Sequence, residues 1–155
     1  MKSKSPGQIS ADRLWLVMMK AHRSIAAYVE ARLSGLGIGM SDFMVLEVLL
    51  HKGPLTISAI GEKVLLTSAS MTSAIDRLED RKLVARKTCD SDRRVRYVEL
   101  TAAGRKLIDG IYSEHLRDLD LVMEDLSDGE RRTLYEGMKK LGFRAKEIAR
   151  GSGEV

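Results

Sequence analysis

Short hydroxyl side chains gather just after residue 66, at a spacing that suits contact with a polyanion. They belong to Ser68, Ser70, Thr72 and Ser73, and Thr67 precedes them. Hydroxyls hydrogen-bond to phosphates and, with weak selectivity, to base edges, and Arg77 one turn further on can reach a guanine or a phosphate. Capping of a helix is the simpler role for a hydroxyl, and we expect Thr67 to have it. For the other four hydroxyls we expect contact with DNA, because a helix places them away from its apolar face.

Cations dominate the segment from residue 81 to residue 106. It holds nine Lys or Arg against three Asp or Glu, a local charge of +6 in a chain whose net charge is +4, which leaves −2 for the remainder. A basic segment on a nearly neutral body is typical of proteins that bind nucleic acid, and a solvated charged face is the simpler alternative. We expect Arg86, Lys87 and Arg96 to contact phosphates, which adds affinity without specificity.

Two short helices are expected to position these four hydroxyl-bearing residues. Thr56 is placed to cap a helix that runs to about Val64, and Leu65 and Leu66 then form a tight turn. The next helix carries apolar residues at i, i+3, i+4 and i+7, the spacing of one buried face, namely Met71, Ala74, Ile75 and Leu78. A short helix, a turn and an amphipathic helix with a polar outer face are typical of a helix-turn-helix.

A β-hairpin is expected to follow. Residues 83–88 and 95–100 contain β-branched, aromatic and alternating positions, whereas residues 89–94 between them are polar. Arg93 and Arg94 lie at the tip of this hairpin. A guanidinium there can enter a narrow minor groove and sense its width.

Long helices are predicted on both sides of these elements, because apolar residues recur there every three or four positions. Ser41 is placed to cap the helix that Gly53 ends, and Ser127 with Glu130 forms a capping box before the last helix. The predicted ranges are about 9–33, 41–52, 101–126 and 128–149.

The chain is therefore predicted to be mainly helical with a small β-hairpin wing. We divide it into a disordered N-terminal tail (1–8), a winged helix-turn-helix domain (41–100) and a helical dimerisation region (9–40 and 101–150). The long helices carry more apolar stripe than one chain can cover, so we expect a homodimer.

Composition narrows the class further. With 155 residues, 44% of them hydrophobic, the chain is long enough for one ordinary domain and is expected to fold. No apolar run approaches the roughly 20 residues of a membrane span, and the single cysteine, Cys89, cannot form an internal disulfide, so we expect a cytoplasmic protein. The sequence contains no phosphate-binding loop and no recognisable nucleophile motif, and we expect neither enzymatic activity nor a cofactor.

Two motifs resemble the MarR family of bacterial transcription regulators. The stretch from Asp92 to Arg105 is similar to the family's wing, in which an Asp-x-Arg tip is followed by a strand ending in Leu-Thr and a helix carrying Gly. Residues 66–72 together with 75–79 resemble the family's recognition helix. The resemblance covers about residues 9–149 in architecture.

This resemblance implies a repressor that binds a palindromic operator as a dimer. Arg94 is then the side chain that enters the minor groove, and Asp92 is its orienting partner. The resemblance also implies a pocket for a small aromatic effector between the long helices and the winged module. The first candidate residues for that pocket are Trp15, Met19, His22, Phe43 and Met44.

Alternative interpretations remain at this stage. A constitutive DNA-binding protein needs no effector, and a helical interaction module would bind a protein through the basic hairpin. For Cys89 we prefer an ordinary thiol to a redox sensor, because acidic residues beside it oppose a lowered thiol pKa. His22, His51 and His115 lack the tight spacing of metal ligands, so we predict no metal site.

Overall fold

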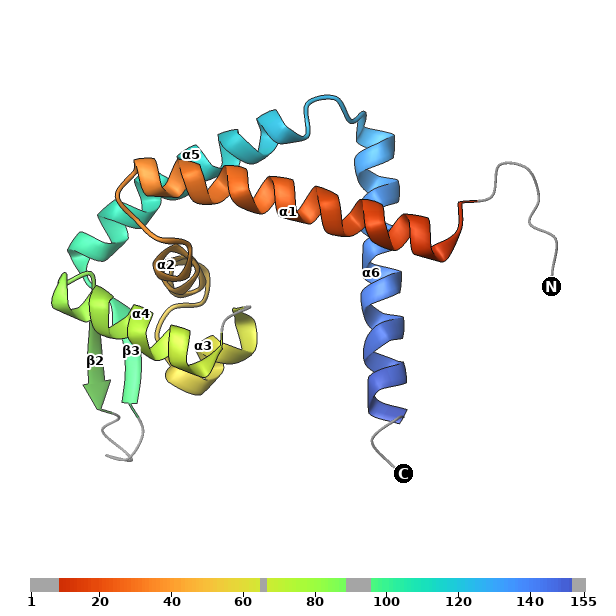
Figure 1. Cartoon of the computed structure of the whole chain (residues 1–155). Helices are drawn as coiled ribbons and strands as arrows, with labels where there is room; N and C mark the ends of the chain where they lie inside the picture. Colours follow the sequence, from red (N-terminus) through yellow and green to blue (C-terminus); the bar gives the residue numbers. More distant parts are fainter. Residues whose placement is uncertain (1–8, 65–66, 89–95, 152–155) are drawn as a thin grey trace. The chain divides into compact units, whose positions relative to one another are not determined.

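The computed structural model, drawn in Figure 1, describes residues 9–64, 67–88 and 96–151. It divides into two compact units, Met1–Leu116 and Arg117–Val155. Its elements, in chain order, are α1 (Ala11–Gly35), α2 (Met40–Lys52), β1 (Leu55–Thr56), α3 (Ile57–Lys63), α4 (Ser68–Asp80), β2 (Val84–Thr88), β3 (Arg96–Leu100), α5 (Ala102–Val122) and α6 (Asp128–Gly151). No single helix in these ranges is long and apolar enough to cross a membrane, whereas α1 and α2 together pass that test of length and composition across a bend of 86°.

Helix α2 lies at the centre of the first unit. Val45 and Leu46 on α2, Ile75 and Leu78 on α4, and Val98 on β3 are all fully buried. Each such side chain contributes about 1.5–3 kcal/mol by leaving water. The core therefore fixes α4 against α2 and against the sheet.

Helices α3 and α4 form the predicted helix-turn-helix. Thr56 caps α3, since its hydroxyl accepts a hydrogen bond from the Ala59 amide at 3.2 Å. Thr67 caps α4 and accepts from the Ser70 amide at 3.2 Å, as expected. The two helices approach closely at Gly61, where a Cβ atom would lie 3.0 Å from the Met71 methyl group. The predicted turn at residues 65–66 lies outside the described residues.

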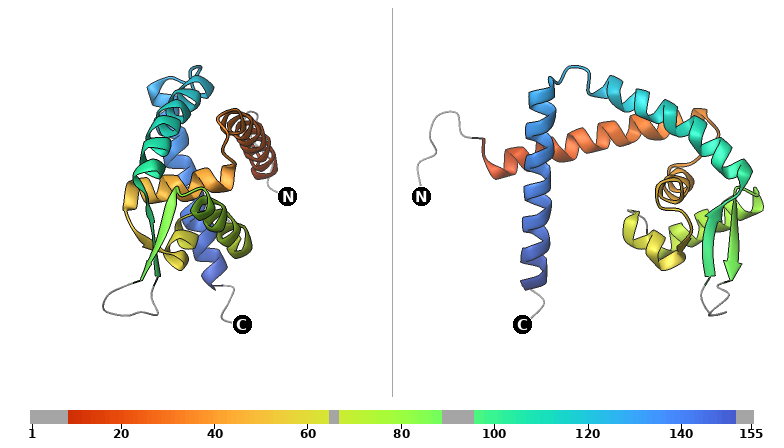
Figure 2. Two further views of the ribbon diagram at one scale, coloured as in Figure 1. Left: turned by 90° about the vertical axis from the view of Figure 1, so that its left-hand side faces the viewer. Right: turned by 180° about the vertical axis from the view of Figure 1, so that it is seen from behind.

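The sheet has three antiparallel strands in the order β1-β3-β2. Both views in Figure 2 show β2 and β3 side by side, with α4 next to them. The hairpin strands are as predicted, but β1 was not predicted. Its two residues pair with the central strand, Leu55 opposite Val98 and Thr56 opposite Tyr97. A two-residue strand has no periodicity of its own, so only its partner identifies it.

A tight turn leads from α4 into β2. Lys82 adopts a left-handed conformation with φ of 57°, and its amide donates to the Glu79 carbonyl at 2.8 Å. The Leu83 amide donates to the Leu78 carbonyl at 2.9 Å. These two hydrogen bonds form a Schellman motif, which satisfies the last carbonyls of α4 and sets the direction of the strand.

The start of α5 is joined to the same turn. The Thr101 hydroxyl donates to the Lys82 carbonyl at 2.8 Å and accepts from the Gly104 amide at 3.0 Å. Gly104 packs against Leu83 so closely that a Cβ atom would lie 1.9 Å from the Leu83 carbonyl oxygen. The Thr101 hydrogen bonds and the packing of Gly104 on Leu83 thus connect the end of α4 to the beginning of α5.

Two predicted helix ends are wrong. Helix α2 begins at Met40 with Gly39 as its N-cap, so Ser41 lies inside the first turn and is not the cap. Helix α5 ends at Val122, not near Leu126, because a turn follows in which the Leu126 amide donates to the Met123 carbonyl.

The second unit contains the end of α5 and all of α6. The predicted capping box is present: the Ser127 amide donates to the Glu130 carboxylate at 2.9 Å, and the Glu130 amide donates to the Ser127 hydroxyl at 3.4 Å. The hydrogen bond from the Ser127 hydroxyl lowers the pKa of Glu130 below its ordinary value. None of the residues of α6 is buried.

Candidate nucleic-acid interface

Three of the four hydroxyl-bearing residues expected to contact DNA lie on the solvent side of α4, as predicted. Ser70, Thr72 and Ser73 are exposed, whereas the predicted apolar face of the same helix is buried, namely Met71, Ala74, Ile75 and Leu78. Ser68 is the first residue of the helix. The Ser70 hydroxyl already accepts a hydrogen bond from the Thr67 hydroxyl at 2.9 Å, so part of its capacity is used within the cap.

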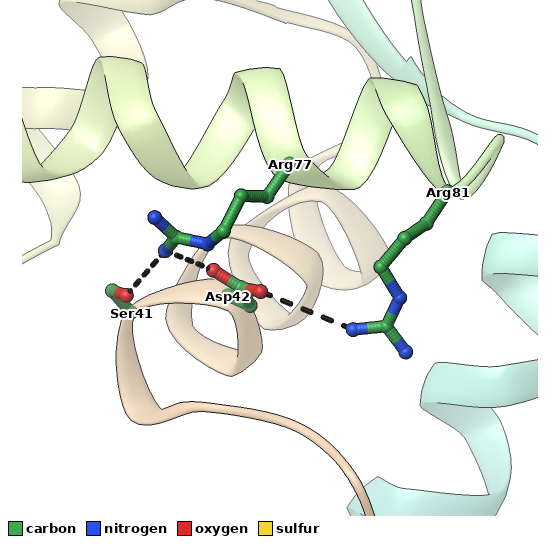
Figure 3. A network of polar contacts seen from close by, with 4 residues as sticks. All are labelled: Ser41, Asp42, Arg77 and Arg81. Carbon is green, nitrogen blue, oxygen red and sulfur yellow. Dashed lines mark hydrogen bonds and ion pairs between the residues drawn. The ribbon is translucent and has the colours of Figure 1, made fainter.

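Arg77 reaches from α4 to the beginning of α2 (Figure 3). Its Nη2 atom donates to Asp42 Oδ1 at 2.5 Å and to Ser41 Oγ at 3.1 Å. Arg81, one turn later, places Nη1 4.0 Å from Asp42 Oδ2. The Asp42 side chain is 7% exposed and that of Arg77 is 51% exposed. The hydrogen bond to Asp42 raises the pKa of Arg77 above its ordinary value.

Asp42 was not among the residues predicted from the sequence. The helix dipole favours a carboxylate in the first turn of a helix. This alone explains an aspartate at position 42, so the sequence gives no reason to expect an arginine partner. The contact with Arg77 spans 35 positions of the chain, so no local pattern signals it.

Arg86 lies against the other side of α4. Its Nη2 atom is 2.5 Å from Asp76 Oδ1, and its Nη1 atom donates to Glu79 Oε2. The side chain is 22% exposed, and the pKa of Arg86 is raised, first by the hydrogen bond to Asp76. Arg86 was predicted to contact phosphates, but its charge is compensated by two carboxylates of α4.

The strands of the hairpin present two further predicted cations. Lys87 is 65% exposed and forms an ion pair with Glu99 of the neighbouring strand at 2.6 Å. Arg96 is exposed at the start of β3. Asp92, Arg93 and Arg94, together with Cys89, lie outside the described residues.

The five predicted effector residues have different surroundings. Trp15, Met19 and His22 are exposed on α1. Phe43 is 2% exposed and packs edge-on against His115, with ring centroids 4.8 Å apart. Met44 lines a hollow of about 460 Å³.

This hollow lies between α2 and the end of α3. Its polar lining residues are Glu47, His51, Lys52 and Lys63, and its apolar ones are Met44, Val48 and Val64. His51 packs against Tyr112 with ring centroids 4.8 Å apart. The hollow is therefore lined by apolar side chains and by groups of both charges, with Tyr112 packed against its His51, which suits a small amphiphilic molecule. Within the described ranges no group of three or more His, Cys, Asp or Glu side chains is placed to hold a metal ion.

Comparison with known proteins agrees with this arrangement. The MarR family matches residues 38–95. The HTH-type transcriptional regulator MhqR of Bacillus subtilis is 35% identical over 136 residues, covering 88% of this chain and 94% of that protein. A mutant MarR from E. coli, solved with operator DNA, is similar with a TM-score of 0.75 at 21% identity, over 83% of this chain and 92% of that one. BpsR from Bordetella bronchiseptica, whose DNA binding is regulated by 6-hydroxynicotinic acid, is similar with a TM-score of 0.76 at 22% identity, over 84% and 98%.

Proposed function

Because the chain belongs to the MarR family of helix-turn-helix transcription regulators, which are DNA-binding proteins and not enzymes, we propose that it is a homodimeric repressor of a palindromic operator, released by a small aromatic effector. The observation that carries the proposal is the exposed hydroxyl face of α4 beside the cationic strands of the hairpin. Such a helix fits the major groove, and a basic hairpin fits the adjacent backbone or minor groove.

The predicted contact residues other than Arg77 and Arg86, which are paired with carboxylates of the same chain, have direct roles in this proposal. Thr72 and Ser73 on the outer side of α4 meet base edges, and Ser68 and Ser70 at its N-terminus meet bases or phosphates. Lys87 and Arg96 contact phosphates from the hairpin strands. By resemblance to the family, Arg94 enters the minor groove with Asp92 as its orienting partner, and Arg93 lies beside it.

Uncovered apolar faces support the homodimer. On α6 the exposed fractions are 54% for Leu134, 45% for Met138, 46% for Leu141 and 54% for Ile148, and these residues share one helical stripe. On α1, Trp15 and Val17 are each 62% exposed. Apolar surface of this kind usually marks an interface, and a second copy of the chain is the partner that a two-fold operator requires.

The effector part of the proposal is supported by the hollow beside α2 and by the regulation of BpsR by 6-hydroxynicotinic acid. An aromatic acid or phenol would place its ring against the apolar lining residues and its polar group against His51 or Lys63. A thermal-shift series with phenols, quinones and hydroxylated aromatic acids tests this. An effector at 100 times its dissociation constant adds about 2.7 kcal/mol of stability. A series without any shift would favour a constitutive DNA-binding protein.

Selection of bound sequences from a random duplex pool tests the DNA-binding part. We expect an imperfect palindrome whose half-sites are about 10 base pairs apart, because two α4 helices related by a two-fold axis enter successive major grooves. Moving the half-sites apart by half a helical turn should abolish specific binding. Recovery of asymmetric sites, or of no preferred sequence, would contradict the proposal.

A further inference from the structure

Ion pairs hold α4 from two different sides. At about 100° per residue, Arg77 and Arg81 share the flank that faces α2, whereas Asp76 and Glu79 share the flank that faces β2. The buried stripe of α4 lies between the two flanks, and Ser73 lies on the outer side. Each flank is therefore tied to a different neighbouring element.

The contact between α4 and α2 depends on a carboxylate that is almost completely buried. Asp42 is 5% exposed and lies in the first turn of α2, where the helix dipole favours its negative charge. Arg77 makes the close contact at 2.5 Å, and Arg81 is 4.0 Å away. Loss of Arg77 would leave a buried charge without a close partner, so the contact strongly favours one orientation of α4.

The contact between α4 and β2 depends on the single guanidinium of Arg86, which binds two carboxylates at once. Arg86 binds Asp76 through one nitrogen and Glu79 through the other, and these carboxylates are three residues apart on α4. Two contacts from a planar group restrict both distance and angle. Arg86 also offsets part of the negative charge of these two carboxylates, which would otherwise oppose the approach of phosphates more strongly.

A small rotation of α4 would disturb base contacts. Side-chain atoms lie about 5–6 Å from a helix axis, so a roll of about 10° moves them by roughly 1 Å. Hydrogen bonds to bases tolerate a range of only about 0.5 Å in length. The close-packed apolar face of α4 already limits its roll, and two ion-pair groups on different flanks add hydrogen bonds that are sensitive to distance and angle.

We propose that the Asp42–Arg77 pair and the Arg86–Asp76–Glu79 group set the roll of α4 on DNA, and thereby its sequence preference. Arg77 and Arg86 are thus positioning residues that act through Asp42, Asp76 and Glu79. This inference rests on the proposed function of α4 as the recognition helix. It replaces a direct reading role for Arg77 with an indirect one.

A double-mutant cycle on the full-length protein tests the α2 side. Asp42→Asn, Arg77→Gln and the double variant are measured on the selected operator and on scrambled DNA, with circular dichroism to confirm folding. We expect each single change to lower the ratio of specific to non-specific affinity by about fivefold or more, and the double change to lower it no further than the stronger single one. Arg81→Gln is the matched control and should change the ratio less than twofold, since Arg81 is the distant partner.

If Arg77 reads bases itself, Arg77→Gln lowers the ratio and Asp42→Asn leaves it unchanged, which overturns the proposal. Failure of the proposed function is a separate outcome, because the unmodified protein would then show no operator preference. Arg86→Gln keeps the test decisive if Asp42→Asn does not fold, since Arg86 is not in the core. We expect a repeated selection with Arg86→Gln to return an altered or weakened consensus. An unchanged consensus and affinity ratio would overturn the part assigned to β2.

Discussion

Cations around α4 differ in what their side chains contact. Arg77 and Arg86 are bound to carboxylates of the same chain, whereas Arg96 is exposed at the start of a hairpin strand. A basic side chain engaged in an internal ion pair cannot give its full charge to a phosphate. At the scale of single residues, the charge of +6 for residues 81–106 therefore overstates what is available to DNA, because Arg86 is paired with two carboxylates outside that segment.

Replacement of Arg96 by Ala should weaken binding to operator and to scrambled DNA by the same factor, because phosphate contacts carry no sequence information. The slope of log affinity against log salt should become shallower by about 0.9 for each phosphate that the variant no longer neutralises. A salt titration by fluorescence anisotropy measures both quantities. Lys52→Ala, which removes a cation of α2 outside the predicted interface, is the control, and an equal effect there would contradict the assignment.

Local hydrogen bonds stabilise both ends of α4 in the winged module. Thr67 caps the beginning of α4, a Schellman motif ends it, and Thr101 ties that end to α5. Each of these contacts gives a hydrogen-bond partner to backbone N–H or C=O groups at the helix ends that have none within the helix. At the scale of elements, these contacts stabilise both ends of α4 and connect its C-terminal end to α5.

Thr67→Ala should destabilise the protein by about 0.5–2 kcal/mol, since the first turn of α4 loses its side-chain acceptor. Chemical denaturation measures the change. Thr133→Ala is the matched control: this hydroxyl bonds to the Gly129 carbonyl inside an exposed helix, and its removal should change stability by less than about 0.5 kcal/mol. Equal effects of the two changes would show that Thr67 is not an important cap.

Gly104→Ala should destabilise the protein by about 1–3 kcal/mol, because the new methyl group would overlap the Leu83 carbonyl oxygen at 1.9 Å and force α5 away from the turn that precedes β2. Gly110→Ala in the same helix is the control. No atom lies within 4 Å of a Cβ built there, so this change should stabilise the protein by about 0.5–1 kcal/mol. Thermal unfolding of both variants checks the opposite signs.

Exposed apolar side chains distinguish the long helices from the winged module. The winged module buries apolar residues around α2, whereas Trp15 and Val17 of α1 are exposed and none of the residues of α6 is buried. Such a helix gains little from folding within one chain, because most helical stability comes from packing. At the scale of the whole molecule, the proposed dimer accounts for what the single chain leaves uncovered.

Leu141→Glu should convert the proposed dimer into a monomer at micromolar concentration, because it places a charge within the apolar stripe of α6. Sedimentation velocity gives the mass, and affinity for the two-fold operator should fall with it. Arg132→Glu on the opposite face of α6 is the control and should leave the dimer intact. A stable dimer of the Leu141 variant would exclude this stripe from the interface.

Sequence alone determined most elements and their caps. The repeats of Met71, Ala74, Ile75 and Leu78 predicted α4 and its buried face, and the structure confirms the caps predicted at Thr56, Thr67 and Ser127. These features involve residues within a few positions of each other, so their physics is contained in a short window of sequence. Chain composition likewise indicated a basic segment, and two motifs indicated the family.

Tertiary structure decided what depends on distant residues. Strand β1 exists because β3 pairs with it, Asp42 meets Arg77 across 35 positions, and Gly104 must be glycine because Leu83 lies against it. Side-chain type predicts that an arginine can bind an anion, but not whether the anion is a phosphate or a carboxylate of the same chain. That choice follows from packing, since the fold brings a buried carboxylate to Arg77 before any DNA arrives.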